Sequence, residues 1–195
     1  MCKTIKKAIT ISIIVIIFTI AVIASFYIIK HSKRKSVIEN VCEIYSNENI
    51  NERLSKETDI STDSLSLKID GETIIGVVKI DKINYEGLVS KGTSLSTLEN
   101  YVGHFENTPY LNGNVCLAAH NTNKFWAKLH TLQVGDKITY TSFLGTKEYF
   151  VTNVSTISET DWSVLDNTNE NTLTLITCVK GQPNLRLCVQ ALEKK

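Results

Sequence analysis

The chain has 195 residues, of which 43% are hydrophobic and 21% are charged, and it contains only nine Gly and two Pro. This composition is typical of a globular protein and excludes collagen-like and intrinsically disordered chains. From Ser36 onward there are 14 basic and 20 acidic residues, which gives this part of the chain a net charge of −6. Because nucleic-acid binding requires a basic surface that displaces counterions from phosphate, we expect no nucleic-acid partner.

Residues 9–29 form an uncharged segment in which apolar side chains dominate. As a helix, its 21 residues would rise about 30 Å, which is the thickness of the hydrocarbon core of a bilayer. One alternative is a cleaved signal peptide, since Ala24 ends a cleavage-like sequence, but the apolar run continues for five more residues. The other is a buried core helix, which is disfavoured because so little of the run is polar. The segment therefore predicts a single-pass anchor, and the basic residues on both flanks leave its orientation open.

A short helix and a polar linker are predicted after the anchor. Ser36 and Glu39 have the spacing of a capping box, and apolar residues recur at helical intervals as far as Tyr45. Residues 46–71 are rich in Asn, Ser, Thr, Asp and Glu and show little periodicity, as expected of a linker. The chain thus divides into an N-terminal segment at 1–8, the anchor at 9–29, a juxtamembrane stalk and linker at 30–71, and a folded domain at 72–195.

The folded domain consists of short β-branched runs separated by turn residues, which predicts a series of strands. Short helices are predicted at 94–101 and 123–132. Many closely spaced strands with few helices favour a mainly β domain, either a closed barrel or a sandwich. The predicted strands cover residues 73–80, 85–89, 114–119, 136–142, 147–158, 172–178 and 185–191.

The five cysteines are better explained as free thiols than as a disulfide framework, because their number is odd and the chain is not cysteine-dense. Cys178 ends an apolar strand and precedes a polar turn, a position at which a thiol can be exposed enough to act as a nucleophile. Its alternative role is that of a small buried hydrophobic residue, as for most lone cysteines. Cys116 and Cys188 lie inside predicted strands and are expected in the core.

A thiol nucleophile needs a base, and His120 is the first candidate among the four histidines. It directly follows an apolar strand and therefore lies at a strand end, where functional groups tend to collect. His31 lies in the basic membrane flank, and His130 is expected on the surface or edge of an amphipathic helix. His104 is either a site residue or a hydrogen-bonded loop histidine.

Acyl transfer also needs positive charge or hydrogen-bond donors where the carbonyl oxygen becomes negative. Arg186 lies eight residues after Cys178, on the next predicted strand. If the two strands pair in an antiparallel hairpin, Arg186 comes level with the neighbourhood of Cys178. The alternative is a surface arginine with no part in chemistry.

Several stretches of the sequence resemble the sortase family of cysteine transpeptidases. Thr-Leu-Ile-Thr-Cys at 174–178, followed by Arg186, is similar to the TLxTC...R signature, and Leu-Ala-Ala-His at 117–120 resembles the LAGH segment of the family. The resemblance extends from about Glu72 to Leu192, and the N-terminal anchor fits it as well. Further similar stretches are Val-Gly-His-Phe at 102–105, Phe-Trp-Ala-Lys-Leu at 125–129 leading to Val-Gly-Asp-Lys at 134–137, and Thr-Asp-Trp-Ser-Val-Leu at 160–165.

Departures from the family pattern indicate the subclass. Ala119 stands where many relatives have Gly. The predicted strands ending at 158 and starting at 172 are too close for the long helical insertion of class B. Neither Pro109 nor Pro183 follows an Asp, so the Asp-Pro-aromatic lid of class C is missing. The chain therefore resembles the class A and D group most.

The resemblance implies an eight-stranded sortase-type β-barrel with short helices, preceded by one transmembrane helix. It also implies that Cys178 attacks the Thr carbonyl of an LPxTG-like sorting signal and forms a thioester, that His120 transfers protons, and that Arg186 stabilises the oxyanion and positions the signal. Thr177, Ala119 and Trp162, which lie within the similar stretches, are the expected substrate-binding residues.

By the same resemblance, the partners are secreted proteins with C-terminal LPxTG-like sorting signals and an amine of peptidoglycan or its precursor in a Gram-positive cell. Residues 1–8 would be cytoplasmic, and the catalytic domain at 72–195 would be outside the cell membrane. No cofactor is expected; some class A enzymes use calcium, but no acidic cluster assigns a metal site in this sequence. The alternative function is a membrane-tethered binding domain that kept the barrel and lost catalysis. Papain-like hydrolysis is disfavoured because the chain has no Cys-Gly-x-Cys-Trp segment.

Overall fold

A computed structural model describes residues 2–46 and 66–194, with only the backbone for residues 2–11. The chain divides into two compact units, Met1–Asn40 and Val41–Lys195. Most of the linker predicted at 46–71 lies outside the described residues.

The first unit is built on one long helix, α1 (Cys2–Ser46). Its large apolar side chains between Ile13 and Ile29 are exposed, and the part from Ser12 onward is long and apolar enough to cross a membrane. The sequence predicted a separate helix from Ser36, whereas α1 continues through this position without a break. The physical reason is that no Gly or Pro interrupts residues 30–46.

The second unit is mainly β. The strands of the described part of the chain are β1 (Leu67–Ile69), β2 (Glu72–Ile80), β3 (Tyr85–Lys91), β4 (Val102–His104), β5 (Asn114–Ala118), β6 (Lys137–Ser142), β7 (Gly145–Ser158), β8 (Thr172–Val179) and β9 (Gln182–Glu193). They are joined by one short α-helix, α4 (Leu95–Asn100), and by the 3-10 turns η1 (Asp81–Ile83), η2 (Leu129–Thr131) and η3 (Ser163–Leu165).

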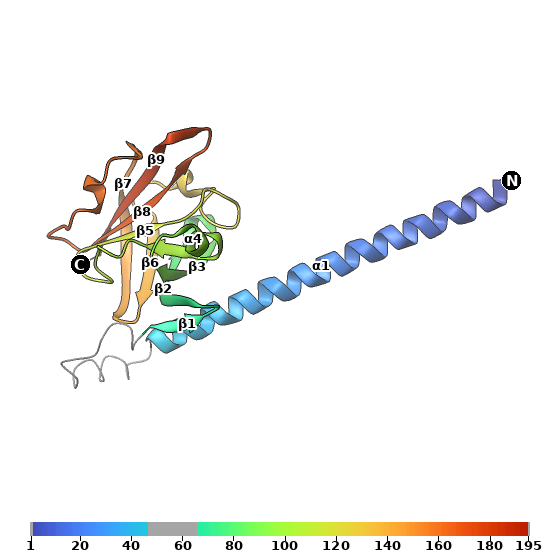
Figure 1. Cartoon of the computed structure of the whole chain (residues 1–195), viewed down its shortest axis with the longest axis horizontal. Coiled ribbons are helices and arrows are strands. Elements are labelled where there is room, and N and C mark those ends of the chain that lie inside the picture. Colours follow the sequence, from blue (N-terminus) through green and yellow to red (C-terminus); the bar gives the residue numbers. More distant parts are fainter. Residues whose placement is uncertain (1, 47–65, 195) are drawn as a thin grey trace. The chain divides into compact units, whose positions relative to one another are not determined.

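Eight of the strands close into a barrel in the order β2-β3-β4-β5-β8-β9-β7-β6, because β6 pairs back with β2 (Figure 1). β3 runs parallel to β4 and β5 parallel to β8, while the other neighbours are antiparallel. β1 pairs only with the first residues of β2 and lies outside this ring. The prediction of a mainly β, eight-stranded barrel preceded by an apolar helix is confirmed.

The closure between β2 and β6 depends on Gly76, which lies beside an irregularity in β2. A Cβ at Gly76 would lie 2.5 Å from the carbonyl oxygen of Thr141 and 3.0 Å from the Tyr140 ring. Only glycine lets the two backbones approach this closely.

Of the two short helices predicted in the domain, one is present and one is wrong. Ser94 caps α4 by accepting a 3.1 Å bond from the backbone N–H of Thr97. Residues 123–132 instead form turns that end in η2, because neighbouring Phe125 and Trp126 are both buried. Adjacent residues of an α-helix point in different directions, so burial of this pair outweighs the helical spacing of the apolar residues.

The last turn of α1 belongs to the barrel unit and is fixed to it by Tyr45. The Tyr45 hydroxyl donates a 2.7 Å bond to the Ile74 carbonyl and accepts one of 3.2 Å from the Leu67 N–H. Its ring packs edge-on against Phe143 with the centroids 6.3 Å apart. The start of the β-sheet is therefore held to the end of the helix.

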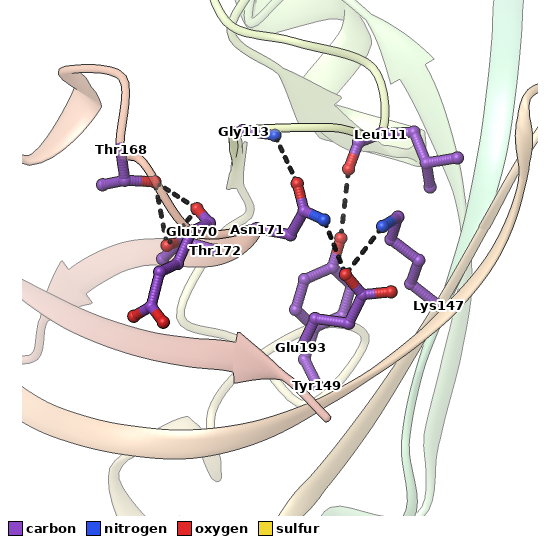
Figure 2. Close-up of polar contacts among 9 residues, drawn as sticks. All are labelled: Leu111, Gly113, Lys147, Tyr149, Thr168, Glu170, Asn171, Thr172 and Glu193. Atoms are coloured by element: carbon purple, nitrogen blue, oxygen red, sulfur yellow. Dashed lines mark hydrogen bonds and ion pairs between the residues drawn. The ribbon is translucent and has the colours of Figure 1, made fainter. Parts of the chain in front are cut away.

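A polar network fastens the chain where β8 begins and β9 ends (Figure 2). The Glu193 carboxylate accepts bonds of 2.7 Å from Lys147 Nζ and 2.6 Å from Asn171 Nδ2. Asn171 Oδ1 in turn accepts a 2.8 Å bond from the Gly113 N–H. The network joins β7, β9 and two loops, and it lies at the end of β8 opposite to Cys178.

Candidate active site

Cys178, His120 and Arg186 lie at the same end of three neighbouring strands. Cys178 on β8 is directly opposite Arg186 on β9. β5 runs parallel to β8, and its last pair is Ala118 with Ile176, so continuing both strands by two residues brings His120 level with Cys178. Because β8 lies between β5 and β9, Cys178 occupies the middle of the three. The structure thus brings the three residues predicted to be catalytic to one place.

Strand alternation determines which of these side chains reach the surface. Cys178 is exposed, whereas its neighbour Thr177 is 2% exposed, because successive residues of a strand point to opposite faces. Directly opposed residues of an antiparallel pair share a face, with Cβ atoms about 4.5–5.5 Å apart. Arg186 therefore projects from the same outer face of the barrel as the Cys178 thiol.

The ends of β5 and β8 are tied together on both sides of His120. The Ala119 N–H donates a 3.2 Å bond to the Ile176 carbonyl, and Thr177 Oγ1 donates one of 2.7 Å to the Ala119 carbonyl. Asn121 Nδ2 donates a 2.7 Å bond to the carbonyl of Cys178. The backbone that carries His120 is thus fixed against the backbone of Cys178.

The His120 residue itself is half-buried and has defined neighbours. Its carbonyl accepts bonds of 3.0 Å from the Thr122 N–H and 3.1 Å from the Trp126 N–H. Its ring packs edge-on against Phe125 with the centroids 6.3 Å apart. The turns within residues 123–132, which replace the predicted helix, therefore support the position of this ring.

Arg186 is held by three acceptors. Its Nη1 donates bonds of 2.6 Å to the Pro183 carbonyl and 2.9 Å to the Leu185 carbonyl, and its Nη2 donates a 2.9 Å bond to Glu159 Oε2. Glu159 follows the last residue of β7, a strand that pairs with β9 on the side away from β8. The guanidinium is thus fixed by two carbonyls of its own strand, β9, and by the residue that follows β7.

The segment after β7 carries Trp162, which is 61% exposed and packs edge-on against Phe105 at a centroid distance of 6.5 Å. This segment is pinned by Asn114, whose Nδ2 donates bonds of 2.9 Å to the Val164 carbonyl and 2.8 Å to the Asp166 carbonyl. Asn114 Oδ1 accepts a 2.7 Å bond from Thr174 Oγ1 on β8. An exposed aromatic side chain is therefore presented on a fixed backbone.

Asn114 and Glu159 were not identified from the sequence. Both act on segments that are distant in the chain, so no local spacing marks them. The only available signal was the placement of each at the boundary of a predicted strand.

Three other cysteine side chains are described, and none of them is exposed as Cys178 is. Cys116 and Cys188 are fully buried free thiols, and Cys42 is a half-buried one. Burial raises the pKa of Cys116 to about 12 and that of Cys188 to about 11, so both remain protonated at neutral pH. These findings confirm the prediction that Cys116 and Cys188 are core residues.

The remaining histidines lie on other elements of the structure. His104 is buried on β4, where its Nε2 is 3.0 Å from the Pro109 carbonyl and its ring stacks on Tyr110. His130 is exposed on η2, and His31 is exposed on α1. Within residues 2–46 and 66–194, no group of three His, Cys, Asp or Glu residues is arranged to hold a metal ion.

Comparison with known proteins identifies the family to which the chain is similar. A family model described as the Sortase domain matches residues 78–194. Sortase A of Listeria monocytogenes serovar 1/2a (strain ATCC BAA-679 / EGD-e) is 28% identical over 206 residues, which cover 95% of this chain and 91% of the relative. Sortase A of Bacillus anthracis is 32% identical over 127 residues, covering 63% of this chain and 60% of the relative. The structure of a Clostridium perfringens sortase D5 transpeptidase superimposes with a TM-score of 0.64 at 29% identity, covering 84% of this chain and 99% of that one.

Proposed function

The chain belongs to the sortase family, and we propose on that basis that it is a membrane-anchored transpeptidase acting on LPxTG-like sorting signals of secreted proteins. The observation that carries the proposal is the shared strand end at which Cys178 lies between His120 and Arg186. A binding domain without catalysis has no need to expose a thiol at this position.

In the first half-reaction, His120 holds the proton of the Cys178 thiol, and the Cys178 thiolate attacks the Thr carbonyl carbon of the signal. The carbonyl oxygen becomes negative and is stabilised by N–H donors of Arg186. As the C–N bond after Thr breaks, His120 gives a proton to the leaving amine. The products are a thioester on Cys178 and the released C-terminal fragment.

In the second half-reaction, an amine of peptidoglycan or its precursor attacks the thioester carbonyl. His120 takes the proton from this amine, and the thiolate leaves as the new amide bond forms. The protein substrate ends up joined to the amine, and the enzyme is regenerated.

Of the proposed substrate-binding residues, Trp162 has the most direct support because its side chain is exposed on the segment after β7. Thr177 and Ala119 are buried and hydrogen-bonded to each other. We propose that these two residues hold the backbone segments that carry His120 and Cys178 against each other.

We further propose that the reaction needs no cofactor. Chelation by EDTA, followed by addition of calcium, is therefore expected to leave the transfer rate unchanged. A large gain in rate on adding calcium would show that the chain binds the ion.

The central test incubates the full chain in detergent with a library of LPxTG-like peptides and an amine, then identifies products by mass spectrometry. We expect a thioester on Cys178 and a ligated product, and neither in Cys178→Ala. Peptide binding without any thioester would support the alternative, a membrane-tethered binding domain on the same barrel.

A further inference from the structure

A carboxylate lies against the Arg186 guanidinium, and the reaction scheme gives it no role. The side chains of Glu159 and Arg186 are 39% and 27% exposed and form an ion pair of 2.9 Å. Exposed ion pairs of this kind contribute little to folding stability. The pair is therefore more informative about the site than about the stability of the barrel.

The backbone ladder, rather than a chance rotamer, places Glu159 beside Arg186. Ile157 of β7 is opposite Arg186, and Ser158 is opposite Leu185. The pairing of β7 with β9 continues by one more hydrogen bond, because the Glu159 N–H donates a 2.9 Å bond to the Asn184 carbonyl. Glu159 lies two residues beyond Ile157, and residues two apart on a strand share a face.

The hydrogen bonds of Arg186 determine how many of its N–H donors remain for a substrate. A guanidinium has five N–H donors in a fixed plane. Within the described part of the chain, Nη1 gives two of them to carbonyl oxygens and Nη2 gives one to Glu159. Two donors remain, which is the number needed for a bidentate contact with a carbonyl or oxyanion.

Resting on the function proposed above, we infer that Glu159 is a positioning residue that orients the Arg186 guanidinium toward the reacting carbonyl. Orientation of Arg186 favours the reaction, whereas the negative charge of Glu159 disfavours it, because this charge partly cancels the positive charge that stabilises the oxyanion. At a half-exposed site, solvent and salt weaken this Coulomb effect, while the direction of a hydrogen bond is retained. Orientation therefore dominates, and loss of Glu159 slows the reaction.

The test compares Glu159→Ala and Glu159→Gln with wild type, using a peptide that the library experiment has identified and triglycine as the amine. Gln keeps an acceptor oxygen and Ala does not. We expect kcat to fall about 10-fold in Glu159→Ala and about 3-fold in Glu159→Gln, with KM within about 2-fold of wild type in both. A charge effect would instead make both variants faster.

The matched control is Glu148→Gln. Glu148 lies on the same strand, β7, and forms an exposed ion pair of 2.6 Å with Lys137, distant in sequence from Arg186. This control should keep wild-type kcat, which separates a positioning role from a general loss of surface charge. Thermal unfolding of all variants checks that the barrel is intact.

A double-mutant cycle shows whether Glu159 acts through Arg186. In the Arg186→Lys background, Glu159→Ala should lower kcat by less than about 2-fold. An equal loss in both backgrounds, or wild-type kcat in Glu159→Ala, would overturn the positioning role alone. If the wild-type chain forms no thioester with any peptide of the library, the proposed function itself fails, and the role of Glu159 falls with it.

Discussion

His104 is a buried histidine of the barrel. Its Nε2 lies 3.0 Å from the Pro109 carbonyl, which can only accept, so the proton sits on Nε2. The other ring nitrogen, Nδ1, is buried without a hydrogen-bond partner among the described residues. Desolvation is the main cause that lowers the pKa of this ring, although the bond to Pro109 and the charge of Glu106 act in the opposite direction.

The burial of His104 predicts a pH-dependent stability. Because its pKa is lower in the folded than in the unfolded protein, the unfolded chain binds the proton first. The contribution to stability is therefore full above the unfolded pKa of about 6.5 and is lost as the pH falls below it. Urea unfolding at pH 7.5 and 5.5 measures the free energy of unfolding. Between these two pH values it should fall less in His104→Gln than in wild type, and equal decreases would contradict this account.

Substitution of Arg186 by lysine tests directed hydrogen bonds against charge alone. Lysine keeps the positive charge but loses the planar fork of donors. If those donors act mainly in the transition state, kcat should fall about 100-fold, or about 2.7 kcal/mol, while KM changes much less. Steady-state kinetics with a peptide identified by the library experiment measures both constants. Near wild-type kcat in a folded Arg186→Lys protein would remove the oxyanion role from Arg186.

Cys188 lies near the proposed site, but, unlike Arg186, we expect it to be dispensable for the reaction. It is fully buried on β9, two residues beyond Arg186. Cys188→Ala should cost about 1–3 kcal/mol of folding free energy through lost packing, measured by urea unfolding. Thioester formation on Cys178 should persist, and its loss in a folded variant would contradict this assignment.

At the scale of elements, Asn114 connects β5 to the segment that follows β7. It is 1% exposed, and its side chain bonds to Val164, Asp166 and Thr174. Its own N–H also lies 3.3 Å from Asn167 Oδ1. One buried amide thus determines where the Trp162 segment lies on the outer face of the barrel.

Asn114→Ala should loosen this segment. The substitution leaves two carbonyls and the Thr174 hydroxyl without their partner, which costs about 1–3 kcal/mol for each buried group that water does not reach. We expect faster proteolysis within residues 159–171 and a higher KM for the peptide. Asn153→Ala is the control, because Asn153 is exposed and its side chain makes only long contacts of 3.4–3.5 Å with other described residues. Equal protection of the segment in Asn114→Ala would argue against the pinning role.

The sequence was informative where a structural feature is local. Runs of β-branched residues between turn residues predict the long strands, and the eight-residue spacing from Cys178 to Arg186 predicts the hairpin that places them opposite each other. The three-residue strands β1 and β4 are too short to show a period and were missed. The Glu159 and Asn114 contacts join residues 27 and 50 or more positions apart, so only the closed barrel reveals them.

At the scale of the whole molecule, an apolar helix precedes an acidic catalytic unit. The helix is long and apolar enough to span a membrane, but the basic residues on its two flanks are nearly balanced in number. The positive-inside rule therefore does not determine which side carries the barrel. The proposed chemistry predicts a barrel outside the cell, because its expected substrates, secreted proteins and a cell-wall amine, are both outside.

This argument predicts that Lys3 is cytoplasmic and Lys195 extracellular. Protease added to intact protoplasts should remove the barrel, while a cytoplasmic marker protein in the same cells stays uncut. Lysed protoplasts serve as the control in which both proteins are accessible. A barrel that is fully protected until lysis would place the Cys178 thiol on the cytoplasmic side, where the proposed acceptor amine outside the membrane is out of reach.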